Sequence, residues 1–119
     1  MTDLLALDAT DQIRALEAGT VSASELLEMA LARNAALHAR LNAIVASDPD
    51  RARAAARSID QARAQGRPLG LLAGLPMTVK DTYDVEGMPA SGGGVRAYRD
   101  RPGVKDALTI ARVKAEGAV

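Results

Sequence analysis

The sequence predicts an α/β layered fold in which helices alternate with short buried strands. Four stretches combine helical periodicity with capping or stop residues, whereas residues 41–46 and 76–80 are short, apolar and flanked by turn formers. Ala118 and Val119 look like the first residues of another strand. We therefore expect the chain to be cut within a larger domain whose sheet is incomplete here.

The N-terminal part, residues 1–40, is predicted to be helical. Asp8 is an acidic cap in front of a short helix that stops at Gly19. Ser22 and Glu25 have the spacing of a capping box, and a stripe of leucines and alanines continues the second helix to about His38.

Residues 41–66 are predicted to form a strand followed by a helix. Residues 41–46 are apolar and partly β-branched and end at Ser47-Asp48-Pro49, which is typical of a buried strand. Asp48 as N-cap and Pro49 as the first helical residue then favour a helix that ends near Gly66. Its apolar stripe is mostly alanine, so this helix is expected to lie close against its partner.

Residues 67–104 are predicted to hold a strand that ends in a lysine, followed by a long loop. Pro76 suits the first position of the strand, because proline has no backbone N–H to donate and that position does not need one. Residues 77–80 continue the strand. Residues 83–102 are rich in turn formers and predict a loop. Residues 105–117 are then expected to form a helix that Asp106 caps and Gly117 ends.

The composition argues against several classes of function. The 119 residues carry 15 basic and 15 acidic side chains, so a nucleic-acid-binding domain is not expected. With no cysteine and one histidine, disulfides and a conventional zinc site are not expected either. The chain has no apolar run of about 18 residues, so no membrane span is expected, and residues 1–10 lack the basic segment and the apolar run of a signal peptide, so none is expected there. We expect a metal-free cytoplasmic protein.

Lys80 is the strongest candidate for chemistry. It follows an apolar run at a predicted strand end, and ligand sites in open α/β sheets gather beyond the carboxyl ends of strands. Burial there would disfavour the ammonium form, which would let a lysine act as a general base or nucleophile. The alternative that the residues alone leave open is a surface lysine paired with Asp81.

For the other polar features a structural role is the preferred interpretation. His38 is expected to sit at a helix end, because no Gly-x-Ser-x-Gly elbow is present. The arginines of residues 51–67 are expected to form a solvated helix face rather than an anion site. Gly92–Gly94 lacks the ending of a phosphate-binding loop. Asp81 and Asp84 are expected to hold the strand exit by hydrogen bonds rather than to form an acid–base pair.

Several stretches together resemble the amidase-signature family. The lysine motif of that family is matched by Gly74-Leu75-Pro76-Met77-Thr78-Val79-Lys80-Asp81 and the following Tyr83-Asp84-Val85-Glu86-Gly87-Met88-Pro89. Further pieces agree in order and spacing: Thr20 to Leu26, Leu41 to Val45, Gly70 to Gly74, Asp106-Ala107 and Ala115 to Val119. The chain departs from many members at Thr82 and in the loop Ser91 to Gly94.

The resemblance implies the N-terminal portion of a single layered α/β/α domain with a mixed sheet. It also implies a Ser–cis-Ser–Lys triad in which Lys80 is the ultimate base and which needs no metal or cofactor. Both serines of the triad would lie beyond Val119, so the chain alone is expected to be inactive. Ser91 is expected to be structural.

Two classes of function stay open. The first is an amidase acting on a small carboxamide or, within the same family, an amidotransferase A-type subunit that releases ammonia from glutamine. The second is a non-catalytic interaction module, because an unpaired strand edge and exposed apolar helix faces favour association with a partner or with a second copy of the chain.

Overall fold

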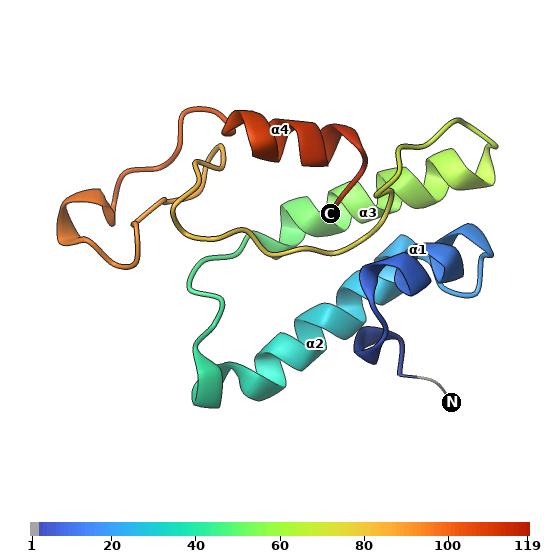
Figure 1. The fold of residues 1–119 in the computed structure, drawn as a ribbon, viewed down its shortest axis with the longest axis horizontal. Helices are drawn as coiled ribbons and strands as arrows, with labels where there is room; N and C mark the ends of the chain where they lie inside the picture. Colours follow the sequence, from blue (N-terminus) through green and yellow to red (C-terminus); the bar gives the residue numbers. More distant parts are fainter. Residues whose placement is uncertain (1–2) are drawn as a thin grey trace.

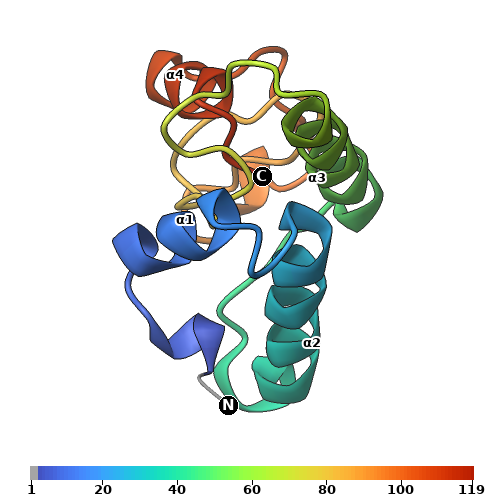
Figure 2. The ribbon, with the colours of Figure 1, turned by 90° about the vertical axis from the view of Figure 1, so that its right-hand side faces the viewer.

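The computed structural model describes residues 3–119, which form helices arranged around an extended segment (Figure 1). In order, the elements are η1 (Leu4–Ala6), α1 (Ala9–Glu17), α2 (Ala23–Leu41), α3 (Pro49–Ala64), η2 (Arg96–Tyr98) and α4 (Leu108–Ala115). In Figure 1, α1 and α2 lie in the lower half of the view, α3 lies above them, and α4 lies above α3. Figure 2 shows that the second half of α2 extends away from α1, α3 and α4.

The first three helices begin where the sequence predicts. The Asp8 carboxylate caps α1. Both bonds of the capping box are present at α2: Glu25 N donates to Ser22 Oγ over 3.1 Å, and Ser22 N donates to the Glu25 carboxylate over 2.8 Å. Asp48 caps α3, with Pro49 as the first helical residue. These starts could be predicted because each cap contacts an amide only three residues away.

The prediction of a strand at residues 41–46 is not met in the described part of the chain. Helix α2 continues to Leu41 and ends at Asn42, which has a left-handed backbone with φ 46°. Residues 43–48 have no regular structure, and Val45 is 64% exposed. The physical reason is that a strand needs a neighbour for its backbone hydrogen bonds, and no segment of residues 3–119 lies in register beside this one.

The prediction that Asp106 caps the last helix is wrong. Helix α4 starts at Leu108, and its N-cap, Ala107, makes no side-chain hydrogen bond. Asp106 lies one residue too early and accepts instead from Glu86 N over 2.9 Å and from Lys114 Nζ over 2.8 Å. It therefore ties the long loop to α4.

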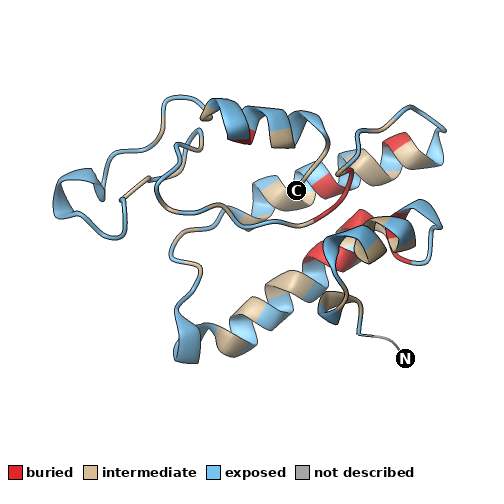
Figure 3. Cartoon of the chain, viewed as in Figure 1, coloured by how far each residue is buried: buried red, intermediate tan, exposed pale blue. Residues whose placement is uncertain are grey.

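The core lies where α1, α2 and α3 meet (Figure 3). Leu16 of α1, Leu26 of α2 and Ala56 of α3 are fully buried. The alanine stripe of α3 packs against α2, as the sequence predicts for a close helix pair. A few further buried residues, Ala73, Leu75 and Ile110, extend the apolar interior toward α4.

Asp60 of α3 fixes the start of α2. Its carboxylate accepts from Ala23 N over 2.8 Å, from Ser24 N over 3.0 Å and from Ser24 Oγ over 2.6 Å. The first amides of a helix have no partner within the helix, and the helix dipole favours an anion there. Asp60 therefore links α3 to α2 by charge as well as by packing.

The extended segment that leads to Lys80 runs alongside the end of the chain. Val119 N donates to Leu75 O, and Met77 N donates to Val119 O, each over 2.9 Å. This alternation is the pattern of a parallel strand pair. Residues 3–119 nevertheless contain no regular strand, so the mixed sheet that the sequence predicts is not formed by this part of the chain. Residues 78–80 have no backbone hydrogen bond to a neighbouring extended segment within residues 3–119.

Candidate functional site

Lys80 lies at the end of the extended segment and is exposed. Its backbone carbonyl accepts from Tyr83 N over 3.0 Å, which turns the chain directly after the lysine. Its ammonium forms no salt bridge within residues 3–119, so the pairing with Asp81 that the sequence left open is not observed. The described residues do not bury Lys80, so they do not supply the desolvation that a neutral lysine requires.

The backbone that carries Lys80 is weakly held on its N-terminal side. Met77 is the last residue of the segment whose amide pairs with the chain end. Among the described residues, no acceptor receives a hydrogen bond from the amides of Thr78, Val79 or Lys80. The next anchored residue is Asp81, directly after the lysine.

Asp81 accepts hydrogen bonds from both the backbone and the side chain of the turn at residues 91–94. Its carboxylate accepts from Ser91 N over 2.8 Å, from Ser91 Oγ, and from Gly93 N over 3.3 Å. Its backbone carbonyl accepts from Gly92 N over 2.9 Å. The turn is closed by Gly94 N, which donates to Ser91 Oγ over 2.9 Å.

These hydrogen bonds lower the pKa of Asp81 from its ordinary value of 3.8. The largest cause is the Ser91 hydroxyl, followed by the Ser91 amide, while partial desolvation acts in the opposite direction and the Gly93 amide adds a smaller lowering effect. A carboxylate that accepts several N–H and O–H bonds is favoured in its charged form. Asp81 therefore acts as an ionised anchor, in line with the hydrogen-bonding role that the sequence favours.

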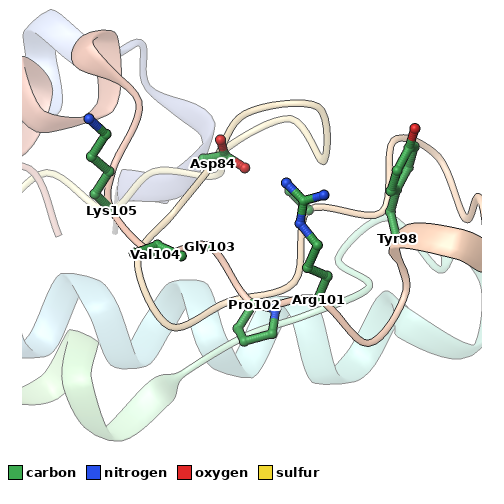
Figure 4. A pocket seen from close by; sticks show the side chains of 8 residues that line it. Asp84, Tyr98, Arg101, Pro102, Gly103, Val104 and Lys105 are labelled. Atoms are coloured by element: carbon green, nitrogen blue, oxygen red, sulfur yellow. The ribbon is translucent and has the colours of Figure 1, made fainter.

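Asp84 and Asp81 share no hydrogen-bond partner among the described residues, so no acid–base pair is observed between them. Asp84 lines a shallow groove of about 440 Å³ in the long loop, and Figure 4 shows it with Tyr98, Arg101 and Lys105 around that groove. Lys80 does not line the groove. The groove is consequently no part of the site around the lysine.

The arginines of residues 51–67 are more than a solvated face. Arg53 Nε contacts the Glu28 carboxylate over 2.6 Å and thereby joins α3 to α2. Arg51 donates to Glu86 O over 2.6 Å, and Arg63 donates to Ala73 O over 3.1 Å. Three of these side chains thus tie α3 to other parts of the structure, which their amphipathic spacing did not indicate.

Sequence reasoning missed the roles of Asp60 and Asp106, because each binds atoms far away along the chain. His38 lies in the last turn of α2, as expected. Within the described residues, no group of three or more acidic or histidine side chains is arranged to hold a metal ion. None of the helices in residues 3–119 has the length and apolarity needed to cross a membrane.

Comparison with known proteins gives consistent results. Residues 25–119 match the amidase family. The chain is 40% identical over 111 residues to an indoleacetamide hydrolase of Bradyrhizobium diazoefficiens, a match that covers 93% of this chain and 21% of the relative. It is 41% identical over 119 residues to the A-type subunit of a glutamyl-tRNA(Gln) amidotransferase of Chloroflexus aurantiacus, covering 100% of this chain and 24% of the relative.

Solved structures agree with the sequence relatives. A bacterial aryl acylamidase of the amidase-signature family superposes with a TM-score of 0.89 at 27% identity, covering 95% of this chain and 24% of that chain. A vestigial protein complex linked to the origins of an s-triazine catabolic enzyme gives a TM-score of 0.88 at 37% identity. The match covers 95% of this chain and 25% of that chain. The chain spans about a quarter or less of the length of these proteins, whose fold is that of α/β amidases. The family match over residues 25–119 and the likeness to these relatives and solved structures show that the chain belongs to the amidase-signature family.

Proposed function

We propose that residues 1–119 form the lysine-bearing N-terminal portion of a single amidase domain that hydrolyses a carboxamide. The observation that carries the proposal is the family match over residues 25–119, which contains the motif around Lys80 at the end of a segment held in parallel register by Val119. The relatives include a hydrolase and an amidotransferase component, and both names imply cleavage or transfer of an amide nitrogen.

In the proposed reaction, Lys80 is the final proton acceptor. A nucleophilic serine attacks the amide carbon, and its proton passes through a second serine, held in a cis peptide, to the neutral Lys80 amine. Backbone amides stabilise the oxyanion, and the proton is returned to the leaving nitrogen as ammonia or an amine departs. Water then hydrolyses the acyl-serine. Both serines would belong to parts of the complete domain that lie outside these residues.

The complete domain must also change the surroundings of Lys80. The lysine is exposed in residues 3–119, whereas a lysine that acts as a general base needs surroundings that disfavour its ammonium form. We infer that further segments of the domain pair with residues 77–80 and cover the lysine. The amides of Thr78, Val79 and Lys80, which have no partner within residues 3–119, are suited to pair with another strand.

Replacing Lys80 tests the proposal in the complete protein. Lys80→Ala should lower kcat/KM for a small amide such as indole-3-acetamide by about 100-fold or more, because the proton acceptor is removed. Lys105→Ala is the matched control, since Lys105 is also an exposed loop lysine, and it should behave like the unmodified protein. Activity of Lys80→Ala within roughly tenfold of the control would contradict the assignment.

A second candidate function is a non-catalytic module that docks on a partner protein or on a second copy of the chain. Large apolar side chains on the surface favour it, with Val104 91% exposed and Leu71 79% exposed. The reading frame after the Val119 codon separates the two candidates. Two serines within a glycine- and serine-rich stretch there would support the amidase, whereas an immediate stop codon would support the docking module.

Substrate class and location belong to the same proposal. The alternative to a small carboxamide substrate is glutamine, from which an amidotransferase A-type subunit would release ammonia. Comparing the rates of hydrolysis of L-glutamine and indole-3-acetamide would distinguish the two. We also propose that the protein is cytoplasmic.

A further inference from the structure

The turn at residues 91–94 wraps around the residue that follows Lys80. Four hydrogen bonds join it to Asp81: three reach the carboxylate, and one reaches the backbone carbonyl. Gly92, Gly93 and Gly94 have φ values of +60°, +87° and +93°, a backbone that only glycine adopts readily. Successive amides in such a turn converge and form a concave site for an anion. Here the anion is the Asp81 carboxylate itself.

This contact is the first one after Lys80 that reaches a distant segment of the described chain, and the next is Asp84 O, which accepts from Ala107 N over 2.9 Å. On the N-terminal side, the amides of Thr78, Val79 and Lys80 donate to no acceptor in residues 3–119. The Lys80 carbonyl is engaged only by Tyr83, three residues away. The position of the Lys80 Cα therefore depends on the Asp81 contact.

We propose that Asp81 and Ser91 act as positioning residues that hold Lys80 in place for proton transfer in the amidase reaction. The inference rests on the proposed function of Lys80 and adds two residues that act through it. Neither one touches the reacting atoms. A misplacement of about 1 Å in a catalytic group can lower the rate by about 100-fold, so loss of the anchor would reduce turnover rather than substrate binding.

The chemistry of the contact explains why both residue types are needed. Ser91 Oγ donates to Asp81 and accepts from Gly94 N, so one hydroxyl links the carboxylate to the far end of the turn. Asparagine at position 81 would have an NH₂ group in place of one carboxylate oxygen. That NH₂ group would face the donors of the turn and could not accept a hydrogen bond from them. Threonine at position 91 would keep the hydroxyl, and alanine would remove it.

The test uses the complete protein with indole-3-acetamide and L-glutamine as probe amides. Labelling of the nucleophilic serine with a fluorophosphonate gives the number of intact active sites, so that kcat can be expressed per labelled site. We expect Asp81→Asn and Ser91→Ala each to lower kcat per labelled site by roughly tenfold or more, with KM changed less than about threefold. Ser91→Thr should restore most of the rate, and Asp84→Asn should leave it unchanged because Asp84 lies in the separate groove.

The outcomes distinguish positioning from stability. A residue that only stabilises the fold would reduce the number of labelled sites and leave both kcat per site and its pH profile unchanged, which would overturn the inference. Ser91→Ala removes a single hydroxyl, so it keeps the test valid if Asp81→Asn does not fold. If Lys80→Ala is inactive while both anchor variants keep full turnover per site, only this inference fails. If Lys80→Ala itself stays active, the proposed function fails with it.

Discussion

Gly74 shows how one residue sets the course of the segment that leads to Lys80. Its φ is +90°, and a Cβ built on it would lie 2.7 Å from Ala23 Cβ at the start of α2. Both the backbone conformation and the close approach exclude a side chain. The glycine thus lets the segment pass directly over the α2 N-terminus before it reaches Val119.

Substitution of Gly74 should therefore destabilise the fold. We expect Gly74→Ala to lower the free energy of unfolding by about 1–3 kcal/mol, because strain in the left-handed region adds to the contact with Ala23. Gly66→Ala is the matched control, since Gly66 has φ +64° but nothing within 4 Å of its Cβ position, and it should cost only about 1 kcal/mol. Urea unfolding followed by circular dichroism measures both, and equal losses would contradict the steric part of the argument.

At the scale of elements, the packing of α2 on α3 depends on charges as well as on alanines. Asp60 satisfies two amides and one hydroxyl at the α2 N-terminus, and Arg53 pairs with Glu28. The pKa of Glu28 is lowered, and the largest cause is the hydrogen bond that Arg53 donates to it. The short caps of α1, α2 and α3 act within each helix, whereas these contacts fix how two helices lie together.

Removing the Asp60 carboxylate should loosen this helix pair. We expect Asp60→Ala to lower the free energy of unfolding by about 1–3 kcal/mol, because a charged acceptor is lost and two helix amides are left without their partner. Asp50→Ala on the same helix is the control. The Asp50 side chain is 97% exposed, and its ion pair with Arg53 is long at 3.5 Å. Thermal melts of both variants check the difference. An Asp60 variant no less stable than the control would show that this contact adds nothing.

At the scale of the whole molecule, several carboxylates are held in their charged form by the fold. The pKa of Glu25 is lowered chiefly by the Ser22 amide, and that of Asp106 chiefly by Lys114. Asp81 and Glu28 are shifted in the same direction. A carboxyl group whose pKa is lower in the folded state contributes stability above its unfolded pKa and loses it as the pH falls toward the folded value.

Stability should consequently decrease at acid pH. The loss should begin as the pH falls toward the ordinary values of 4.5 for glutamate and 3.8 for aspartate, and it should continue below them. Circular dichroism between neutral pH and about pH 2 measures it. Asp106→Asn should show a weaker pH dependence below about pH 4 than Asp100→Asn, whose replaced carboxylate is exposed. Identical acid transitions in the two variants would refute the role of Asp106.

The sequence alone determined the local structure of this protein. The caps at Asp8, Ser22 and Asp48 and the glycine that follows each of α1, α3 and α4 were predictable, because each involves hydrogen bonds or backbone angles within a few residues. The motif around Lys80 was likewise readable as a string of residues, and it led to the family that the comparisons show.

Only the tertiary structure decided which groups meet across the chain. Asp60 binds residues 36 and 37 positions away, Asp106 binds Glu86 instead of capping its own helix, and Asp81 binds Ser91. The strand at residues 41–46 did not form, because strand formation depends on a neighbouring backbone and not on apolar residues by themselves. Lys80 is exposed for the same reason: burial is a property of what packs against a residue, and its own segment cannot provide that.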